Sequence, residues 1–306
     1  MSTDPTIRSA SLAVFVTVLW ASSWVLIRIG LDTSELQPLG FAGMRYGLAA
    51  LLLWAAVAYR RARLLPTPAP RTPVRELVVL GVVFYAVTQG AQFVAIANQP
   101  AATTSLILSF TPLLTALVAV VALGERIRTI QAIGMIAVAA GAVLYFTGSL
   151  GYTAVGLVAS FVCLAANTTA AVLGRRINRR ASSDPLMVTV VSMTAGALLL
   201  LVVAAAVEGL RIPSPQALGI ILWLAWINTA WAFVLWNRSL VHLPASTSAV
   251  INNLMLVEIA VLAWLFLDER PSIVQVVAIA VVTVGVVAGS GALGKGSAFR
   301  RPARRR

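Results

Sequence analysis

The chain has 306 residues, of which 59% are hydrophobic and only 11% are charged, and its mean hydropathy is +0.92. These few polar residues cannot cover the surface of a soluble globule of this size. The composition therefore predicts an integral membrane protein and excludes a soluble domain. The formal net charge of +13 raises the alternative of a nucleic-acid partner.

Ten apolar runs have the length of about 20 residues that a helix needs to cross roughly 30 Å of hydrocarbon. The first run is not followed by a small-residue cleavage site, so we expect it to be retained rather than removed as a signal peptide. In chain order the predicted spans are 11–30, 39–59, 77–97, 101–123, 130–147, 152–173, 186–207, 217–237, 245–267 and 273–290.

Most of the 23 Lys and Arg residues lie on one side of the membrane when the spans are threaded in order. The largest groups are in the linker 60–75, in residues 175–180 and in the tail 295–306. Because cytoplasmic loops carry the basic excess, we expect both termini in the cytoplasm. This placement argues against a nucleic-acid partner and makes the lipid bilayer the partner of the basic residues.

Residues 100–126 and 244–270 carry one pattern at a constant separation of 144 residues, from Pro-Ala-x-Thr to an acidic Glu-Arg end. Similarity at a fixed separation indicates an internal duplication. Each copy holds five spans, an odd number, so the second copy must enter the membrane in the opposite orientation. We therefore predict an all-α integral membrane protein of ten transmembrane helices in two inverted five-helix repeats, residues 1–148 and 149–291, with a basic cytoplasmic tail, 292–306.

Inverted repeats are a recurring architecture of secondary transporters, because exchanging the conformations of the two halves opens a central site to each side in turn. Some channels share this architecture, so a passive channel or facilitator for small solutes is the alternative. We do not expect an enzyme, since the sequence has no HExxH or GxSxG motif and its one histidine, His242, lies in a loop. Residues 289–294 match G-x-G-x-x-G outside any α/β context, so we expect no nucleotide or other cofactor.

Five segments carry a likeness to a known family: Leu19–Trp24, Met44–Tyr46, Leu106–Ala116, Leu123–Arg126 and Trp264–Arg270. The first four resemble one EamA repeat, and the last resembles the end of a second. The chain is thus similar over nearly its whole length to the ten-helix EamA-type drug/metabolite transporters. The resemblance implies a carrier in the cytoplasmic (inner) membrane of a bacterium, usually an exporter of amino acids or other small metabolites, as a monomer or homodimer.

Glu258 is the one acidic residue well inside a predicted span. A charge at that depth costs about 2.5 to 3.5 kcal/mol, so this carboxyl should be protonated, paired or in contact with water. It is our candidate for proton coupling or for binding a substrate amine; a neutral carboxyl bonded within the bundle is the alternative. The family often has a Glu-Pro pair nearby, but here those positions hold Met255 and Leu256, so its role does not transfer to Glu258.

The third span carries a polar stripe, in which Tyr85, Gln89 and Gln92 share one helical face with Thr88. Lipid would leave these groups unsatisfied, so the stripe should face protein or a water-filled cavity. Hydrogen bonds between helices are the alternative. Asn167, followed by Thr168, adds polar groups to the sixth span.

Several tryptophans lie too deep for an interfacial belt. Trp20, Trp226 and Trp231 are near mid-membrane, where they can line a cavity for apolar or aromatic groups or simply pack the bundle. Trp24 continues a stripe at four-residue steps from Trp20 to Arg28, which would allow a cation over an aromatic face.

Arg45 lies six residues into the second span, about 9 Å along the helix. It should either snorkel to the outer interface, bind a carboxylate or pair with Glu258. Pro112 removes a backbone hydrogen bond and should bend the fourth span, as a gate or as a fit to its neighbours.

These inferences give two sets of candidates, and no metal site is expected. The predicted coupling or gating residues are Glu258, Arg45 and Pro112. The predicted substrate-binding residues are Trp20, Trp24, Tyr85, Gln89, Gln92, Asn167, Trp226, Trp231 and Glu258.

Overall fold

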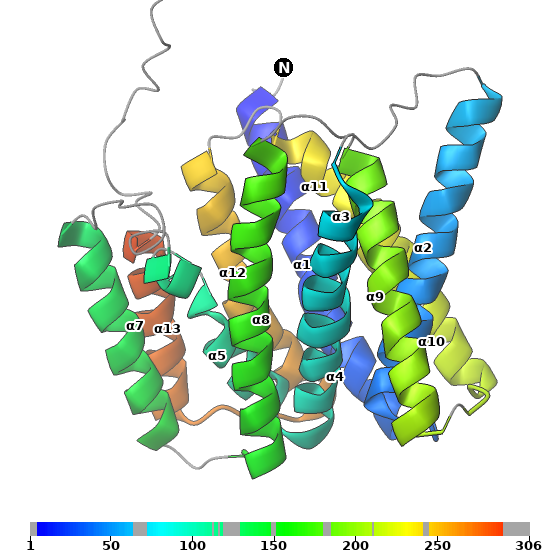
Figure 1. Ribbon diagram of the computed structural model, residues 1–306. Coiled ribbons are helices and arrows are strands. Elements are labelled where there is room, and N and C mark those ends of the chain that lie inside the picture. The colour runs from blue at the N-terminus through cyan, green and yellow to red at the C-terminus, as the bar shows by residue number, and fades with distance from the viewer. Residues whose placement is uncertain are drawn as a thin grey trace, which may run out of the picture.

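All regular elements in the described part of the chain are helices, as a computed structural model shows (Figure 1). The structure describes residues 5–63, 72–111, 113–115, 117–118, 129–147, 151–179, 185–209, 211–240 and 245–289. The predicted basic tail and Pro112 lie outside these residues.

The helices follow the predicted spans closely along the chain. The first part contains α1 (Pro5–Asp32), α2 (Pro38–Ala62), α3 (Val74–Gly81), η1 (Val82–Thr88), α4 (Gln89–Asn98), α5 (Ala101–Leu108) and α7 (Thr129–Thr147). The second part contains α8 (Ala154–Arg179), α9 (Pro185–Val207), α10 (Pro215–Ala225), η2 (Trp226–Trp231), α11 (Ala232–Leu240), α12 (Ala245–Leu267) and α13 (Ile273–Gly289).

The prediction of a multi-pass helical membrane protein is confirmed. Five helices are both long and apolar enough to cross a membrane: Ile7–Asp32, Pro38–Ala62, Val74–Asn98, Ala154–Gly174 and Leu186–Val207. Shorter apolar helices include 132–145, 254–267 and 273–288. The fourth predicted span is interrupted: α5 ends at Leu108, Ser109 and Phe110 form a turn, and helix resumes at Thr111 in the described residues 111, 113–115 and 117–118.

Proline and capping residues explain where several helices begin. Pro38 and Pro215 open α2 and α10, at positions where a helix needs no backbone N–H donor. The hydroxyl of Ser214 accepts a hydrogen bond from the backbone N–H of Ala217 and so caps α10. Gly209 has φ +74°, a conformation that favours glycine, in the turn after α9.

Two segments are π-helical, and they stand at equivalent places in the duplicated sequence. η1 begins at Val82 and η2 begins at Trp226, a separation of 144 residues. In each, a threonine hydroxyl donates to the carbonyl five residues earlier: Thr88 to Val83 at 2.9 Å and Thr229 to Leu224 at 2.8 Å. π-Helical segments often occur at functional sites, so these two mark a region of interest.

Helices α7 and α13 lie side by side at one end of the bundle (Figure 1) and approach each other at two glycines. A Cβ at Gly141 would lie 3.1 Å from the carbonyl oxygen of Ala278, and a Cβ at Gly285 would lie 2.9 Å from that of Gly134. Gly141 and Gly285 are again 144 residues apart, as are Gly134 and Ala278. The contacts are thus reciprocal and the helices antiparallel, which is the relation a two-fold axis between them produces.

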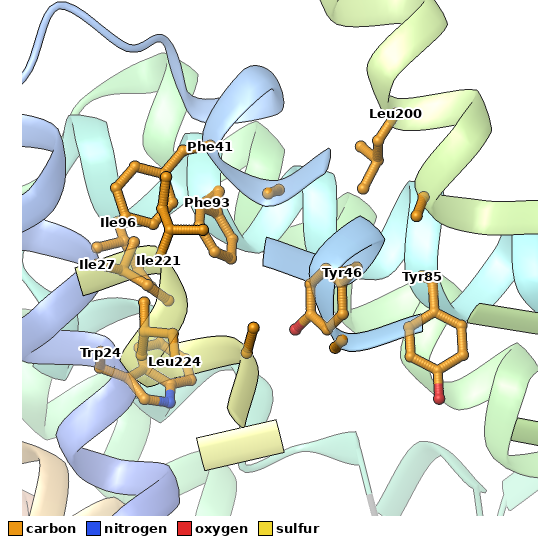
Figure 2. Close-up of a cluster of buried hydrophobic side chains, with 14 of the residues drawn as sticks. Trp24, Ile27, Phe41, Tyr46, Tyr85, Phe93, Ile96, Leu200, Ile221 and Leu224 are labelled. Atoms are coloured by element: carbon orange, nitrogen blue, oxygen red, sulfur yellow. The ribbon is translucent and has the colours of Figure 1, made fainter. Parts of the chain in front are cut away.

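A buried cluster of aromatic and aliphatic side chains joins α1, α2, α4 and α10 (Figure 2). Phe41 and Phe93 pack with ring centroids 5.6 Å apart, and Ile27 and Ile221 are fully buried beside them. Tyr46 and Tyr85 belong to the same cluster, and Figure 2 shows their rings to one side of these apolar groups.

Candidate functional site

A cavity of about 310 Å³ lies inside the bundle near the middle of the helices. Its wall comes from α1, α2, η1, α4, α5, α8, η2, α11 and α12, and it mixes amide, hydroxyl, guanidinium and aromatic groups. The lining residues are Trp20, Ser23, Trp24, Arg45, Tyr46, Phe84, Tyr85, Thr88, Gln89, Gln92, Leu108, Asn167, Asn228, Thr229, Phe233, Asn252 and Met255.

The cavity brings together most of the residues that the sequence singled out. The polar stripe faces it rather than lipid, and the candidates from α1, α2 and α8 join that stripe. The predicted residues that line it are Trp20, Trp24, Arg45, Tyr85, Gln89, Gln92 and Asn167.

Trp226 and Trp231 do not line the cavity, contrary to the expectation from their depth. Their exposed fractions are 64% and 43%, so both rings lie largely on the outside of the bundle. Depth along a helix does not determine which face a side chain occupies, and on η2 it is Asn228 and Thr229 that turn inward.

The lining residues show the duplication. Ten of the seventeen form pairs separated by 144 residues, so equivalent positions of the two halves meet around one space. Sequence reasoning missed Ser23, Thr229 and Phe233. They could have been found as the equivalents, 144 residues away, of Asn167, Tyr85 and Gln89. The five pairs are Ser23 with Asn167, Phe84 with Asn228, Tyr85 with Thr229, Gln89 with Phe233, and Leu108 with Asn252.

Arg45 places a cation in the wall. Its side chain is 6% exposed, and its Nε and Nη2 donate to the hydroxyl oxygen of Thr229, both at 3.3 Å. Its guanidinium carbon lies 5.1 Å from the ring centroid of Tyr46 and 5.9 Å from that of Phe93. Because its side chain is buried, Arg45 does not extend to water. Within the described residues it makes no ion pair, so it does not pair with Glu258.

Beside Arg45, Tyr46 donates its hydroxyl to the side-chain oxygen of Gln89 at 2.7 Å. This bond joins α2 to α4 and fixes the orientation of the amide. The ring of Tyr46 also packs on that of Tyr85 at 5.5 Å. This wall of the cavity is therefore held rigidly by contacts among its own members.

Asn228 fastens η2 to α1 on another side. Its amide nitrogen donates to the carbonyl of Leu19 and to the hydroxyls of Ser22 and Ser23, the latter two at 3.0 Å. Nearby, the ring of Trp20 packs on Phe233 at 5.5 Å and forms an aromatic surface. The cavity thus has one cationic wall and one aromatic wall.

Glu258 lies beside the cavity rather than in its wall. Its Oε1 is 3.0 Å from the hydroxyl of Thr17, which is also 2.8 Å from the carbonyl of Val14. Its Oε2 is buried and has no hydrogen-bond partner in the described part of the chain. Met255, three residues before Glu258 on α12, lines the cavity, and so does Trp20, three residues after Thr17 on α1. The carboxyl of Glu258 is therefore about one helical turn from the cavity.

A second cavity of about 390 Å³ opens at the end of the bundle where α1 ends and α5 begins. Arg28 lines it and pairs with Asp32 at 3.1 Å, while its Nη1 donates to the carbonyl of Ile96 at 2.6 Å. Glu269 accepts from the backbone N–H of Ala101 at 3.2 Å and so caps α5. Burial raises the pKa of the Glu269 carboxyl, and backbone hydrogen bonds partly offset that rise.

Comparisons with known proteins agree with this architecture. The sequence profile of the EamA-like transporter family matches residues 7–147 and, again, residues 153–289. A protein of Archaeoglobus fulgidus named an uncharacterized transporter is 24% identical over 270 residues, which cover 85% of this chain and 89% of that protein.

A probable terminal-alkyne amino-acid exporter of Streptantibioticus cattleyicolor is 27% identical over 287 residues, which cover 90% of each protein. One crystal structure superimposes with a TM-score of 0.65 over 93% of this chain and 96% of that chain. Its sequence identity is 20%, so this likeness concerns the fold alone.

Proposed function

Because the chain belongs to the EamA-like transporter family, we propose that it exports small metabolites such as amino acids by alternating access between two inverted repeats. The protein is a multi-pass membrane transporter and not an enzyme. Our proposal concerns the class of substrate, the direction of transport and the transport mechanism.

The observation that carries the mechanism is the pairing of residues around the central cavity. Equivalent positions of the two halves, such as Tyr85 and Thr229, line the same space at a separation of 144 residues. A site between two related halves faces each side of the membrane in turn when the halves exchange conformations.

The inverted orientation is supported by the contact between α7 and α13. Gly141 and Gly285 make reciprocal contacts between antiparallel helices. If both helices cross the membrane, a two-fold axis that relates them lies in the membrane plane. That is the axis of an inverted repeat.

The substrate class is supported by the cavity wall and by one relative. A cation, several amides and an aromatic surface around about 310 Å³ suit a small solute that has both polar and apolar groups. The Streptantibioticus cattleyicolor relative is named a probable exporter of an amino acid.

We propose Glu258 as the residue of proton coupling. A hydroxyl has one proton to donate, so when Thr17 donates to the carbonyl of Val14 it can only accept from a protonated Glu258. When Thr17 donates to Glu258, the carboxylate can be ionised. The pair thus accommodates both protonation states one turn from the cavity.

Uptake by the purified protein in liposomes tests the function. A panel of labelled amino acids is supplied with and without an imposed pH gradient, and protein-free liposomes are the control. We expect saturable uptake of at least one apolar amino acid, increased by the gradient. Lack of uptake of every member at any gradient would contradict the proposal.

A further inference from the structure

We infer that Arg45 binds the carboxylate of the transported solute and selects for solutes that carry one. This inference rests on the proposed function, since it names the chemical group that the central cavity recognises.

The first observation is a buried cation without a counter-charge. Arg45 is 6% exposed in a helix that spans the membrane, and no carboxylate of the described residues pairs with it. Buried charges in proteins are paired, and intramembrane charges usually mark a substrate or ion pathway. A negatively charged solute in the adjoining cavity would provide the missing partner.

The second observation is unused hydrogen-bonding capacity. A guanidinium carries five N–H donors, whereas the two bonds seen here share one acceptor, the hydroxyl oxygen of Thr229, at 3.3 Å each. That hydroxyl donates its own proton to the carbonyl of Leu224 at 2.8 Å. The remaining donors of Arg45 meet no acceptor in the described part of the chain.

The third observation is that the guanidinium is held in place. The rings of Tyr46 and Phe93 lie 5.1 and 5.9 Å from its central carbon, and Phe93 is itself packed on Phe41. An arginine whose plane is fixed loses little entropy when it forms two parallel bonds to a carboxylate. The site is therefore organised for an anion before the solute arrives.

The duplication adds a reason why one repeat carries this charge. The equivalent of Arg45 is Thr189, a neutral residue, and the equivalent of Tyr46 is Val190. Only one half therefore offers a charge to the shared cavity, which defines one orientation for the solute: carboxylate toward Arg45 and apolar group toward the ring of Trp20.

The test compares three probes that share one phenyl group, by the shift in melting temperature that each produces in purified protein. L-Phenylalanine and 3-phenylpropanoate carry a carboxylate, and 2-phenylethylamine does not. We expect the first two to raise the melting temperature of the wild type and the third to leave it unchanged. An equal response to all three probes, or to none, would overturn the inference.

Four variants locate the effect. Arg45→Gln should lose the response to both carboxylates, and Arg45→Lys should bind them at least tenfold more weakly, because the charge stays while the planar fork is lost. Arg211→Gln removes a cation in an exposed ion pair with Glu35 and should respond as the wild type does. Thr229→Val removes the one side chain bonded to Arg45 and reports, through the melting temperature without ligand, whether that bond has a structural role.

A merely structural role for Arg45 predicts a different result. Arg45→Gln would then lower the melting temperature without ligand, and Thr229→Val would reproduce that loss. We expect the unliganded Arg45→Gln protein to melt no lower than the wild type, since the substitution removes an unpaired buried charge. A lower melting temperature shared by both variants would overturn the inference.

Flux measurements separate this inference from the proposed function. If amino acids move in liposomes and Arg45→Gln moves them equally well, the inference fails and the function stands. If no amino acid moves but 3-phenylpropanoate still stabilises the protein through Arg45, the function fails and the inference stands.

Discussion

At the scale of single residues, the carboxyl of Glu258 and the hydroxyl of Thr17 form a contact that either protonation state can make. The 3.0 Å distance is an ordinary hydrogen bond, and the second oxygen of Glu258 is buried without a described partner. An ionised carboxylate in that position would leave an oxygen unsatisfied. A neutral carboxyl leaves the same oxygen unpaired but carries no charge, so proton binding lowers a cost of burial that proton release restores.

Replacement of Glu258 by Gln tests this role. The amide oxygen can still accept from Thr17, so the fold should be kept, but the residue can no longer titrate. We expect uphill uptake driven by a pH gradient to fall at least tenfold, while exchange of internal for external solute stays within about twofold of the wild type. Uphill uptake at the wild-type rate would rule out Glu258 as the coupling residue.

Thr17→Val is the matched control for that experiment. It removes the hydroxyl but keeps the titratable group and a similar side-chain volume. We expect uphill uptake to persist, with its dependence on pH displaced, because the carboxyl loses the bond that it makes to Thr17.

At the scale of elements, the sequence predicted helix positions well but not helix type or face. Apolar length and prolines such as Pro38 and Pro215 locate the helices. The π-helical segments have no comparable sequence signature. A wider helical turn leaves the length and the apolar character of the span unchanged, and these are the features by which the sequence reveals a membrane helix. Trp226 was expected in the cavity wall but lies on the outer face of η2, because a helix that is apolar all round has no periodicity to orient it.

The packing of α3 and η1 against α9 depends on glycine. A Cβ at Gly81 would overlap the backbone oxygen of Ser192, and a Cβ at Gly196 would overlap the Cβ of Tyr85. Small residues permit this close approach of two membrane helices. The contact positions Tyr85, whose ring lines the central cavity.

Substitution of Gly81 by Ala should therefore destabilise the protein by about 1 to 3 kcal/mol, since the backbone of α9 must shift to admit the methyl group. Thermal melting in detergent measures the effect. Gly219→Ala is the matched control, because nothing lies within 4 Å of its added Cβ and alanine favours a helix. A similar melting temperature for the two variants would contradict the assigned packing.

At the scale of the whole molecule, the duplication relates more of the site residues to one another than any single motif does. The separation of 144 residues relates η1 to η2, Gly141 to Gly285 and ten cavity residues to one another. The residues that a motif search missed, such as Asn228, carry no signature of their own. Their role becomes visible only when two distant segments are seen to enclose one space.

If the repeats are inverted as we propose, equivalent connections lie on opposite sides of the membrane. Arg63 directly follows α2, and Ile212, which is 94% exposed, lies in the equivalent connection between α9 and α10. In a Cys163→Ser background, a membrane-impermeant thiol reagent added to intact cells should label Ile212→Cys and not Arg63→Cys. Labelling of both from one side would indicate parallel repeats.

The most direct test of the central claim is counterflow through the cavity. Liposomes are loaded with unlabelled substrate and diluted into labelled substrate, and the wild type is compared with Asn167→Trp, which fills the cavity between the halves. We predict a transient accumulation of label above equilibrium for the wild type and at least a tenfold smaller one for the variant. Uptake that internal substrate fails to stimulate, or that persists in Asn167→Trp, would contradict alternating access at this site.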